Sequence, residues 1–407
     1  NNINASFSHL MPKKGNIGVI SQSGAMLTSI IDWACGRGIG FSHLISLGDM
    51  NDIGFAEMLD FMSTDQNTNA ILIYMESVHQ ARRFISAARG AARTKPIIVL
   101  KVGRSDEGRQ AAASHTGALA GSDDVYDTAF KRSGLLRVDV MSELFYAAAS
   151  LTAIKPVSGE RLAIVTNGGG MGVLATDALI HHGGTLAKLS AETLDSLNTK
   201  LPPTWSHGNP IDIIGDAGPE RYTDAINALE NDNGIDAVLV LNCPTAVASS
   251  LDAAQVVAEI AQHNNKCLLT SWAGSATAEK SRALFAQQHI PTYATPEAAV
   301  NSFMHLVRYQ RNQKNLMETP PALAADLRFD SDKAWGIVAK VLSEDRLWLN
   351  ELEAKSVLQA YGIPTVESQL AKSPEEAAAI AENLGFPVVI KLFSPDILHK
   401  SDVHGVA

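Results

Sequence analysis

The feature that most constrains this sequence is a pattern that occurs twice: a short aliphatic strand, a turn of small polar residues, and an apolar helix. The first copy has a strand at 16–20 followed by Ser21-Gln22-Ser23-Gly24, and the second has a strand at 162–165 followed by Thr166 and Asn167-Gly168-Gly169-Gly170. With an offset of 145 residues, Ser21 falls on Thr166 and Gly24 on Gly169. The repeat predicts two related α/β domains.

Other segments extend this pattern along the chain. Aliphatic runs predict strands at 70–74, 96–100, 237–241 and 266–269, and apolar periodicity predicts helices at 79–93, 252–263 and 295–311. Strands that alternate with helices at this spacing predict parallel βαβ units with right-handed crossovers. We therefore expect a first α/β domain over residues 1–155 and a second over 156–312.

The rest of the chain predicts a linker and the beginning of a third domain. Residues Gln313–Asp332 are polar, contain proline and lack periodicity, so we assign a linker to 313–345. Residues 346–407 form the third region, with helices predicted at 351–361 and 374–384 and strands at 365–370 and 387–391, the latter buried.

Composition excludes several functional classes. Of 407 residues, 46% are hydrophobic and 19% charged, which is ordinary for a globular protein. The formal net charge is -10 and no long basic run occurs, so nucleic acid is not an expected partner. No segment has the roughly 20 apolar residues of a membrane span, and residues 1–4 do not resemble a signal peptide. The absence of an initial Met leads us to expect a piece of a longer chain.

The three cysteines are too far apart to indicate a disulfide framework or a zinc site. Cys35, Cys243 and Cys267 form no CxxC pair. Patterns typical of zinc proteases, serine hydrolases and P-loop NTPases do not occur either. We expect no protein metal site, and a reducing, cytoplasmic setting.

The two glycine-containing turns are candidate anion sites. Small residues before a helix allow a ligand to approach the helix's unpaired N–H groups and its positive dipole end, which favours phosphate. For one turn alone, a glycine that merely permits a tight turn is the better explanation. Two turns at equivalent places strengthen the phosphate hypothesis.

A small-residue loop with one histidine is the second candidate. It has the sequence Ala113-Ser114-His115-Thr116-Gly117-Ala118-Leu119-Ala120-Gly121 and follows the strand that ends near Lys101. A neutral imidazole is a competent nucleophile toward phosphoryl groups. Glu76 follows the strand at 70–74, where it could hold the second ring nitrogen of His115. The alternatives are a histidine that caps the helix starting near Ser122, and a solvated glutamate.

A third cluster lies near the end of the chain. Lys391 ends a predicted buried strand, and it precedes Ser394-Pro395-Asp396-Ile397-Leu398-His399-Lys400-Ser401-Asp402. A lysine in that position suits a phosphate ligand, although a charged surface loop is an equally good explanation.

Taken together, these motifs resemble those of the NDP-forming (ADP-forming) acyl-CoA synthetases, relatives of succinyl-CoA synthetase, over essentially the whole chain. The resemblance implies two succinyl-CoA synthetase-like (flavodoxin-like) doubly wound parallel-sheet domains followed by the start of an ATP-grasp domain. The segment Ser114–Gly121 looks like the family's phosphohistidine loop, with His115 as the phosphorylated residue and Ser114, Thr116 and Gly117 beside the phosphate. Glu76 matches the glutamate that holds this histidine.

The same resemblance assigns roles to other residues. The turns Ser21–Gly24 and Asn167–Gly170 match the two helix starts that cradle the phosphate, and Gly208–Asp212 resembles a loop near it. Lys391 matches a nucleotide-binding lysine, and His399 matches a second histidine that relays phosphate. One departure is His404, where the family usually has glycine.

The function that the resemblance implies is that of an acid–thiol ligase of the acetate–CoA ligase type. ATP, a carboxylate and CoA would give acyl-CoA, ADP and phosphate through phosphorylated His115. The expected ligands are ATP or ADP with Mg²⁺, and CoA. Most contacts to nucleotide and CoA are expected from family domains outside these residues, so we expect this chain to be catalytically incomplete. A homo-oligomer is also expected.

A second hypothesis comes from the segment Phe303–Lys314 with Glu318-Thr319-Pro320, which looks similar to Pat-type bacterial protein lysine acetyltransferases. Those proteins carry a synthetase-like region ahead of a GNAT domain. The region would then be an acyl-CoA-sensing, oligomerising module, and protein lysines would be the substrates of that GNAT domain. Retention of His115, Glu76 and His399 favours the synthetase.

Overall fold

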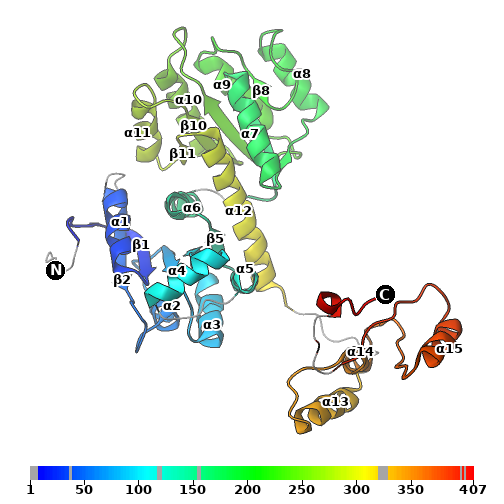
Figure 1. Ribbon diagram of the computed structural model, residues 1–407. Coiled ribbons are helices and arrows are strands. Elements are labelled where there is room, and N and C mark those ends of the chain that lie inside the picture. Colours follow the sequence, from blue (N-terminus) through cyan, green and yellow to red (C-terminus); the bar gives the residue numbers. More distant parts are fainter. Residues whose placement is uncertain are drawn as a thin grey trace. The chain divides into compact units, whose positions relative to one another are not determined.

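The structure is a computed structural model that describes residues 8–35, 39–116, 122–153, 157–319, 329–394, 397 and 400–407, without the side chains of 112–116, 153 and 401–402. It divides into two compact units, residues 1–318 and 319–407. The first unit contains two parallel sheets and the second is helical (Figure 1).

The first sheet has the order β2-β1-β3-β4-β5, and all its pairings are parallel. Its strands are β1 (Lys13–Ser21), β2 (Gly40–Ser46), β3 (Ala70–Met75), β4 (Ile97–Lys101) and β5 (Leu136–Val138). The central strands β3 and β4 are buried along their whole length because helices cover both faces. Continuous aliphatic runs made these two strands predictable.

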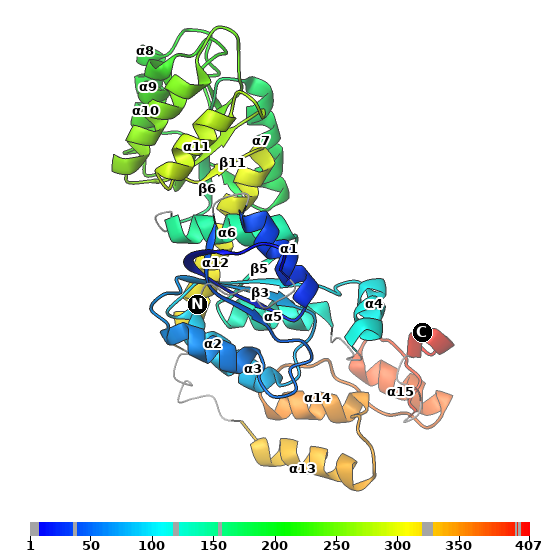
Figure 2. The same ribbon diagram turned by 90° about the vertical axis from the view of Figure 1, so that its left-hand side faces the viewer.

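Helices pack on both faces of this sheet. Helices α2 (Phe55–Thr64), α3 (Ala81–Ala92) and α5 (Asp123–Arg132) cover one face, and α1 (Gly24–Cys35) and α6 (Met141–Ala153) cover the other (Figure 2). Helix α4 (Asp106–Thr116) follows β4. The two hydrophobic cores therefore lie on opposite sides of one sheet.

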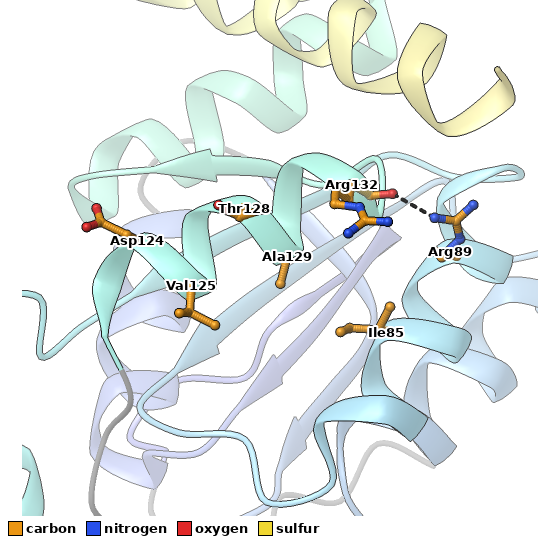
Figure 3. A pocket seen from close by; sticks show the side chains of 7 residues that line it. All are labelled: Ile85, Arg89, Asp124, Val125, Thr128, Ala129 and Arg132. Atoms are coloured by element: carbon orange, nitrogen blue, oxygen red, sulfur yellow. Dashed lines mark hydrogen bonds between the residues drawn. The ribbon is translucent and has the colours of Figure 1, made fainter. Parts of the chain in front are cut away.

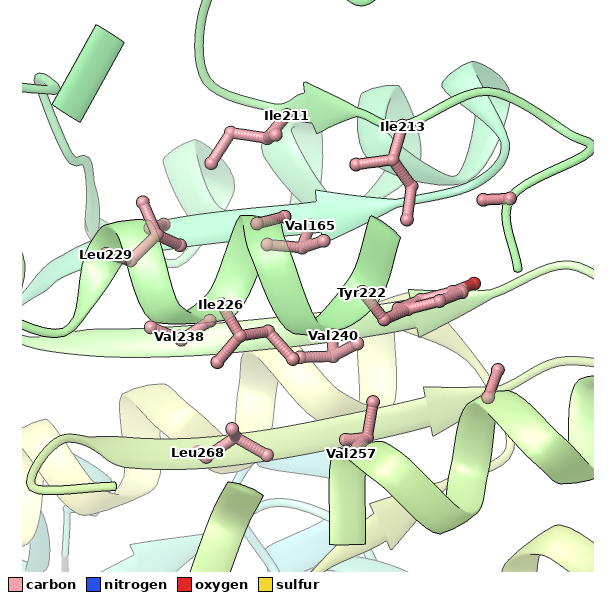
Figure 4. Packing of buried hydrophobic residues seen from close by; sticks show 14 of the residues in the cluster. Val165, Ile211, Ile213, Tyr222, Ile226, Leu229, Val238, Val240, Val257 and Leu268 are labelled. Carbon is pink, nitrogen blue, oxygen red and sulfur yellow. The ribbon is translucent and has the colours of Figure 1, made fainter. Parts of the chain in front are cut away.

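The second sheet repeats this plan with the order β11-β10-β9-β6-β7. Its strands are β6 (Arg161–Thr166), β7 (Thr185–Leu186), β9 (Ala237–Asn242), β10 (Cys267–Trp272) and β11 (Thr292–Tyr293), while β8 (Ile211–Asp212) pairs with β6. Its helices are α7 (Gly169–His181), α8 (Ala191–Lys200), α9 (Pro219–Leu229), α10 (Ser250–His263), α11 (Glu279–Gln287) and α12 (Pro296–Met317). Figure 4 shows the core under α9, where Ile226, Leu229 and Tyr222 pack on Val165, Val238 and Val240.

The two sheets share one topology. Strands β7-β6-β9-β10-β11 correspond to β2-β1-β3-β4-β5, which is the doubly wound flavodoxin-like order. The predicted fold class of two such α/β domains is confirmed.

Helix α12 connects the two sheet domains of the first unit. Its first half packs in the core of the second domain through Phe303 and Met304, whereas Leu316 near its end belongs to the core of the first domain. Asn312 Nδ2 donates to the carbonyl of Leu135 at 2.7 Å and Gln313 Nε2 to that of Gly134 at 2.9 Å. The helix therefore extends to Met317 instead of Arg311, because its polar last turns gain tertiary partners that periodicity does not reveal.

The second unit contains α13 (Ser331–Ser343), α14 (Glu351–Ala360), α15 (Pro374–Leu384) and a short 3₁₀ helix, Lys400–Val403. Helix α13 lies inside the range assigned to a linker. The predicted helices at 351–361 and 374–384 are confirmed. The predicted strands at 365–370 and 387–391 are wrong: these residues form no named strand, and Val389 and Ile390 are more than half exposed. An aliphatic run becomes a strand only beside a pairing strand, and here Lys391 forms a single bridge with Val406.

Among the helices of the described residues, none is both long and apolar enough to cross a bilayer.

Candidate active site at the carboxyl edge of the first sheet

The turn after β1 is fastened to the turn after β3 by the side chain of Gln22. This side chain is buried, and its Oε1 accepts hydrogen bonds from the backbone N–H of Glu76 at 2.5 Å and of Ser77 at 2.9 Å. Within the first turn, Ser21 Oγ donates to the carbonyl of Ser23 and accepts from its N–H. Two predicted site elements, the Ser21–Gly24 turn and Glu76, are thus brought together.

The turn after β6 is built in the same way. Thr166 Oγ1 donates to the carbonyl of Gly168 and accepts from its N–H, as Ser21 does with Ser23. Asn167 Oδ1 accepts from the N–H of Cys243 at 2.7 Å, and its Nδ2 donates to the Cys243 carbonyl at 2.9 Å. We call these two side chains the Gln22 clamp and the Asn167 clamp. Each bonds to the backbone just after the neighbouring strand, which is β3 in the first domain and β9 in the second. The predicted repeat therefore extends to individual hydrogen bonds.

The helices that follow these turns have no acidic residue in their first turn. This holds for α1 and α7, and also for α3, whereas α2, α4 and α5 each have an aspartate or glutamate in the first turn. An acidic side chain near a helix start neutralises the positive dipole end, so its absence leaves that end available to an external anion. A Cβ built on Gly170 would meet no atom within 4 Å, so the start of α7 is open there. Ser46 Oγ is the nearest atom to a Cβ built on Gly24, at 3.6 Å.

The Gly208–Asp212 segment lies beside the second turn. Asp212 pairs with Thr166 across β8 and β6, and its Oδ2 would be 2.9 Å from a Cβ on Gly169. Asn209 ties this segment down, because its side chain bonds to the backbone of Ile164, Leu162 and Ala187. The Asp212 carboxylate therefore lies beside the start of α7, where it partly offsets the positive end of that helix and narrows the approach of an anion on one side.

Glu76 and His115 arise from neighbouring strands of the first sheet. Glu76 is buried and directly follows β3. His115 lies in the last turn of α4, the helix after β4. The predicted loop is therefore wrong for residues 113–116, whose backbone is helical because the preceding Gln110-Ala111-Ala112-Ala113 run favours a helix. The side chains of Ser114, His115 and Thr116, and all of Gly117 and His399, lie outside the described structure, so the His115–Glu76 pairing stays a prediction.

Lys101 is a candidate site residue that the sequence motifs did not indicate. It ends β4 and is only 1% exposed, with Nζ 2.5 Å from the carbonyl oxygen of Val102 and 4.5 Å from the centroid of the Tyr126 ring. Burial lowers the pKa of Lys101 to about 8. The available signal was a lysine that closes a buried aliphatic run, the same pattern that singled out Lys391.

Lys391 lies in the second unit, where it shares a carboxylate with other lysines. Its Nζ is 2.8 Å from Glu351 Oε1, while Lys400 Nζ is 3.0 Å from Oε2 and Lys355 Nζ is 3.3 Å from Oε1. The hydrogen bond from Lys391 is the largest of the effects that lower the pKa of Glu351 to about 2. The Lys391 side chain is 42% exposed, so it does not end a buried strand as predicted.

A depression of about 500 Å³ between α3 and α5 is lined by Ile85, Arg89, Asp124, Val125, Thr128, Ala129 and Arg132, and none of these is a predicted site residue (Figure 3). No group of three or more His, Cys, Asp or Glu suited to a metal ion occurs within the part of the chain that the structure describes.

Comparisons with known families match three parts of the chain. Residues 14–151 match the succinyl-CoA ligase-like flavodoxin domain, residues 162–317 the Ligase-CoA domain, and residues 340–407 the ATP-grasp domain. The matches follow the two sheet domains and the helical unit in chain order.

Individual proteins give the same result. The chain is 37% identical to ADP-forming acetate–CoA ligase I of Archaeoglobus fulgidus over 99% of its length, and it spans 57% of that relative. It is 38% identical to the alpha subunit of ADP-forming acetate–CoA ligase I of Pyrococcus furiosus, covering 76% of this chain and 67% of that one.

A solved structure agrees with these relatives. The dinucleotide-forming acetyl-coenzyme A synthetase 1 of Ca. Korarchaeum cryptofilum, in complex with phosphate and ADP, superposes with a TM-score of 0.72 at 34% identity. The superposed region covers 79% of this chain and 70% of the chain in that structure. The resemblance to Pat-type acetyltransferases receives no support from these comparisons. The three family matches and the identity to these relatives agree, so the chain belongs to the NDP-forming acyl-CoA synthetase family.

Proposed function

We propose that the protein containing this chain is an ADP-forming acyl-CoA synthetase of the acetate–CoA ligase type. It would convert ATP, a carboxylate and CoA into acyl-CoA, ADP and phosphate. The observation that carries the proposal is the Gln22 clamp, which fastens a helix start without acidic residues to the turn of Glu76, beside the strand that leads to His115. The names of the relatives described above support the same reaction.

In the proposed mechanism His115 carries a phosphoryl group. A ring nitrogen of His115 attacks the γ-phosphorus of ATP, the bond to the ADP oxygen breaks, and ADP leaves. A carboxylate oxygen of the substrate then attacks the phosphorus, which frees the histidine and forms an acyl phosphate. The CoA thiolate attacks the acyl carbon and releases phosphate. Each step transfers one group and requires no redox partner.

The residues of this chain have distinct roles in that scheme. Glu76 would accept a hydrogen bond from the second ring nitrogen of His115 and stabilise the charged imidazole. Backbone N–H groups at the starts of α1 and α7 would stabilise the anionic phosphoryl group, with Ser114, Thr116 and Gly117 beside it.

The ATP-grasp segment supplies the other proposed contacts. Lys391 would bind nucleotide phosphate in exchange for its partner Glu351, and His399 would relay the phosphoryl group. Mg²⁺ would arrive with the nucleotide, and CoA would bind outside the described residues. The three-domain arrangement at 1–155, 156–312 and 346–407, a homo-oligomeric assembly and a cytoplasmic location are part of this proposal.

The test is phosphorylation of the full-length protein with γ-labelled ATP and Mg²⁺. We expect acid-labile, base-stable label that ADP discharges and that is absent from His115→Ala. His181→Ala is the matched control, because His181 lies at the end of α7, away from the proposed site. Acyl-CoA synthesis that continues unchanged in His115→Ala would refute the mechanism. Binding of acyl-CoA without any label would favour the regulatory alternative.

A further inference from the structure

Lys101 occupies a position between the two predicted catalytic elements. It is the last residue of β4 and pairs with Met75, the last residue of β3, which immediately precedes Glu76. Helix α4, which carries His115, begins at Asp106, shortly after Lys101. The lysine therefore lies where the chain leaves the sheet toward His115, next to the strand that leads to Glu76.

The contacts of Lys101 connect it to the Glu76 turn and to the helix that follows the His115 segment. Its ammonium group lies over the ring of Tyr126, and Tyr126 Oη accepts a hydrogen bond from the N–H of Val78 at 3.3 Å. Val78 belongs to the turn that begins with Glu76 and Ser77, whereas Tyr126 lies in the first turns of α5, just after the histidine segment. The Lys101–Tyr126–Val78 connection thus joins the Glu76 turn to the helix downstream of His115.

The burial of this lysine is costly and needs a reason. Among the contacts of the described residues, the only oxygen within hydrogen-bonding distance of Nζ is the carbonyl of Val102. An ammonium group removed from water without a close carboxylate destabilises the fold, and a methionine would fill the same space without that penalty. Buried ionisable groups with perturbed pKa values concentrate at functional sites.

The charged groups around Lys101 are of both signs. Asp123 on α5 and Glu76 after β3 favour its protonated form, whereas Arg137 on β5 and Arg109 on α4 disfavour it. Burial outweighs these effects and lowers the pKa of Lys101 to about 8. Its charge therefore changes close to physiological pH, unlike that of an exposed lysine.

We propose that Lys101 is a positioning residue of the phosphohistidine reaction, which holds the Glu76 turn against the helix after His115 and supplies a buried positive charge beside them. This inference rests on the proposed function. The charge of Lys101 stabilises the carboxylate that orients His115, and the Tyr126 contact fixes the distance between the two segments. Loss of the proton from Lys101 removes its electrostatic stabilisation of the Glu76 carboxylate.

The experiment measures the rate of histidine phosphorylation in the full-length protein between about pH 6.5 and about pH 9.5. In the wild type the rate falls as pH rises through about 8, because Lys101 loses its proton there. Lys101→Met keeps the volume but not the charge, so its rate is roughly ten- to a hundredfold lower at pH 7 and does not fall at pH 8. Lys101→Arg restores much of the rate and moves the decline to higher pH, because a guanidinium stays charged.

The matched control is Lys95→Met. Lys95 precedes the other end of β4, and its Nζ donates to the carbonyls of Met62 and Asp65, so its loss affects folding without reaching the site. We expect a wild-type pH profile from this variant. Tyr126→Phe keeps the ring but loses the Val78 hydrogen bond, and we expect a lower rate with the decline near pH 8 retained.

The outcomes separate this inference from the function on which it rests. A wild type that takes up no base-stable label refutes the proposed function and the inference with it. A labelled wild type with an unchanged rate or an unchanged decline in Lys101→Met overturns the inference alone. If Lys101→Met does not fold, Lys101→Arg decides: a decline that stays near pH 8 overturns the inference, and one that moves upward supports it.

Discussion

At the scale of single residues, the Gln22 side chain joins two turns that are far apart in sequence. It accepts hydrogen bonds from two backbone N–H groups just after β3, those of Glu76 and Ser77, and without it both lose this buried acceptor. We expect Gln22→Ala to lower the free energy of unfolding by about 1–3 kcal/mol, the cost of unsatisfied buried donors, and to slow phosphorylation of His115. Urea denaturation and labelling with γ-labelled ATP measure the two effects.

The control for that variant is Gln80→Ala, because Gln80 is an exposed residue before α3 whose side chain contacts Arg83. We expect it to change neither quantity. If Gln22→Ala and Gln80→Ala proved equally stable, the clamp would contribute nothing to the fold.

Asp236 illustrates a second residue-scale effect, on stability. Its carboxylate is buried and accepts from the Nε, Nη2 and backbone N–H of Arg161 and from Ser158 Oγ, and the Arg161 hydrogen bonds hold its pKa below the usual range. Because the pKa of Asp236 is lower in the folded state than in the unfolded state, where it is near 3.8, the ionised carboxylate stabilises the fold at pH values above 3.8. This stabilisation is lost as the pH falls through the pKa of the folded state. We expect Asp236→Asn to cost about 2–4 kcal/mol at pH 7, and less below pH 4.

Thermal unfolding at pH 7, 5 and 3 tests this dependence. Asp224→Asn serves as the control, because Asp224 forms a half-exposed pair with Lys200 at 3.5 Å that should contribute little. A penalty for Asp236→Asn that stayed constant with pH would show that its charge is not responsible.

At the scale of elements, the C-terminal part of α12 packs into the hydrophobic core of the first domain and is expected to stabilise it. Leu316 is 1% exposed, and a Cβ on Gly134, whose φ is +77°, would approach its Cδ2 to 2.6 Å. We expect Leu316→Ala to cost about 2–5 kcal/mol through the cavity that it leaves. The adjacent Met317 is 63% exposed, so Met317→Ala is the control and should cost less than about 0.5 kcal/mol. Equal losses in chemical denaturation would mean that α12 does not hold the first domain.

At the scale of the whole molecule, the repeat predicts that two helix starts act on one phosphate. Ala25 on α1 and Gly170 on α7 are equivalent, exposed positions in the first helical turn. A carboxylate there complements the helix dipole, so Ala25→Asp and Gly170→Asp should leave stability unchanged or raise it by about 0.3–1 kcal/mol. The same charge repels phosphate, and each variant should phosphorylate His115 roughly ten- to a hundredfold more slowly.

The neutral variants Ala25→Asn and Gly170→Asn control for side-chain size. Labelling rates with γ-labelled ATP and melting temperatures are the measurements. Should only one aspartate variant slow the reaction, a single turn would hold the phosphate and the two-turn hypothesis would fail.

The sequence by itself determined the repeated α/β plan, because buried parallel strands are continuous aliphatic runs and the turns after them are rich in glycine and serine. It also indicated Glu76, the two glycine-containing turns and the His115 segment as candidate site elements. Tertiary structure decided what depends on partners distant in sequence. Gln22 meets Glu76 across 54 positions, and the ammonium group of Lys101 lies over the ring of Tyr126 on α5. The edge strands β7, β8 and β11 have two residues each, too few for any periodicity. Conversely, the run at 387–391 has strand composition, but among the described residues only its end pairs, through Ile390 with Ala407 and a single bridge from Lys391 to Val406, which is too little for a named strand.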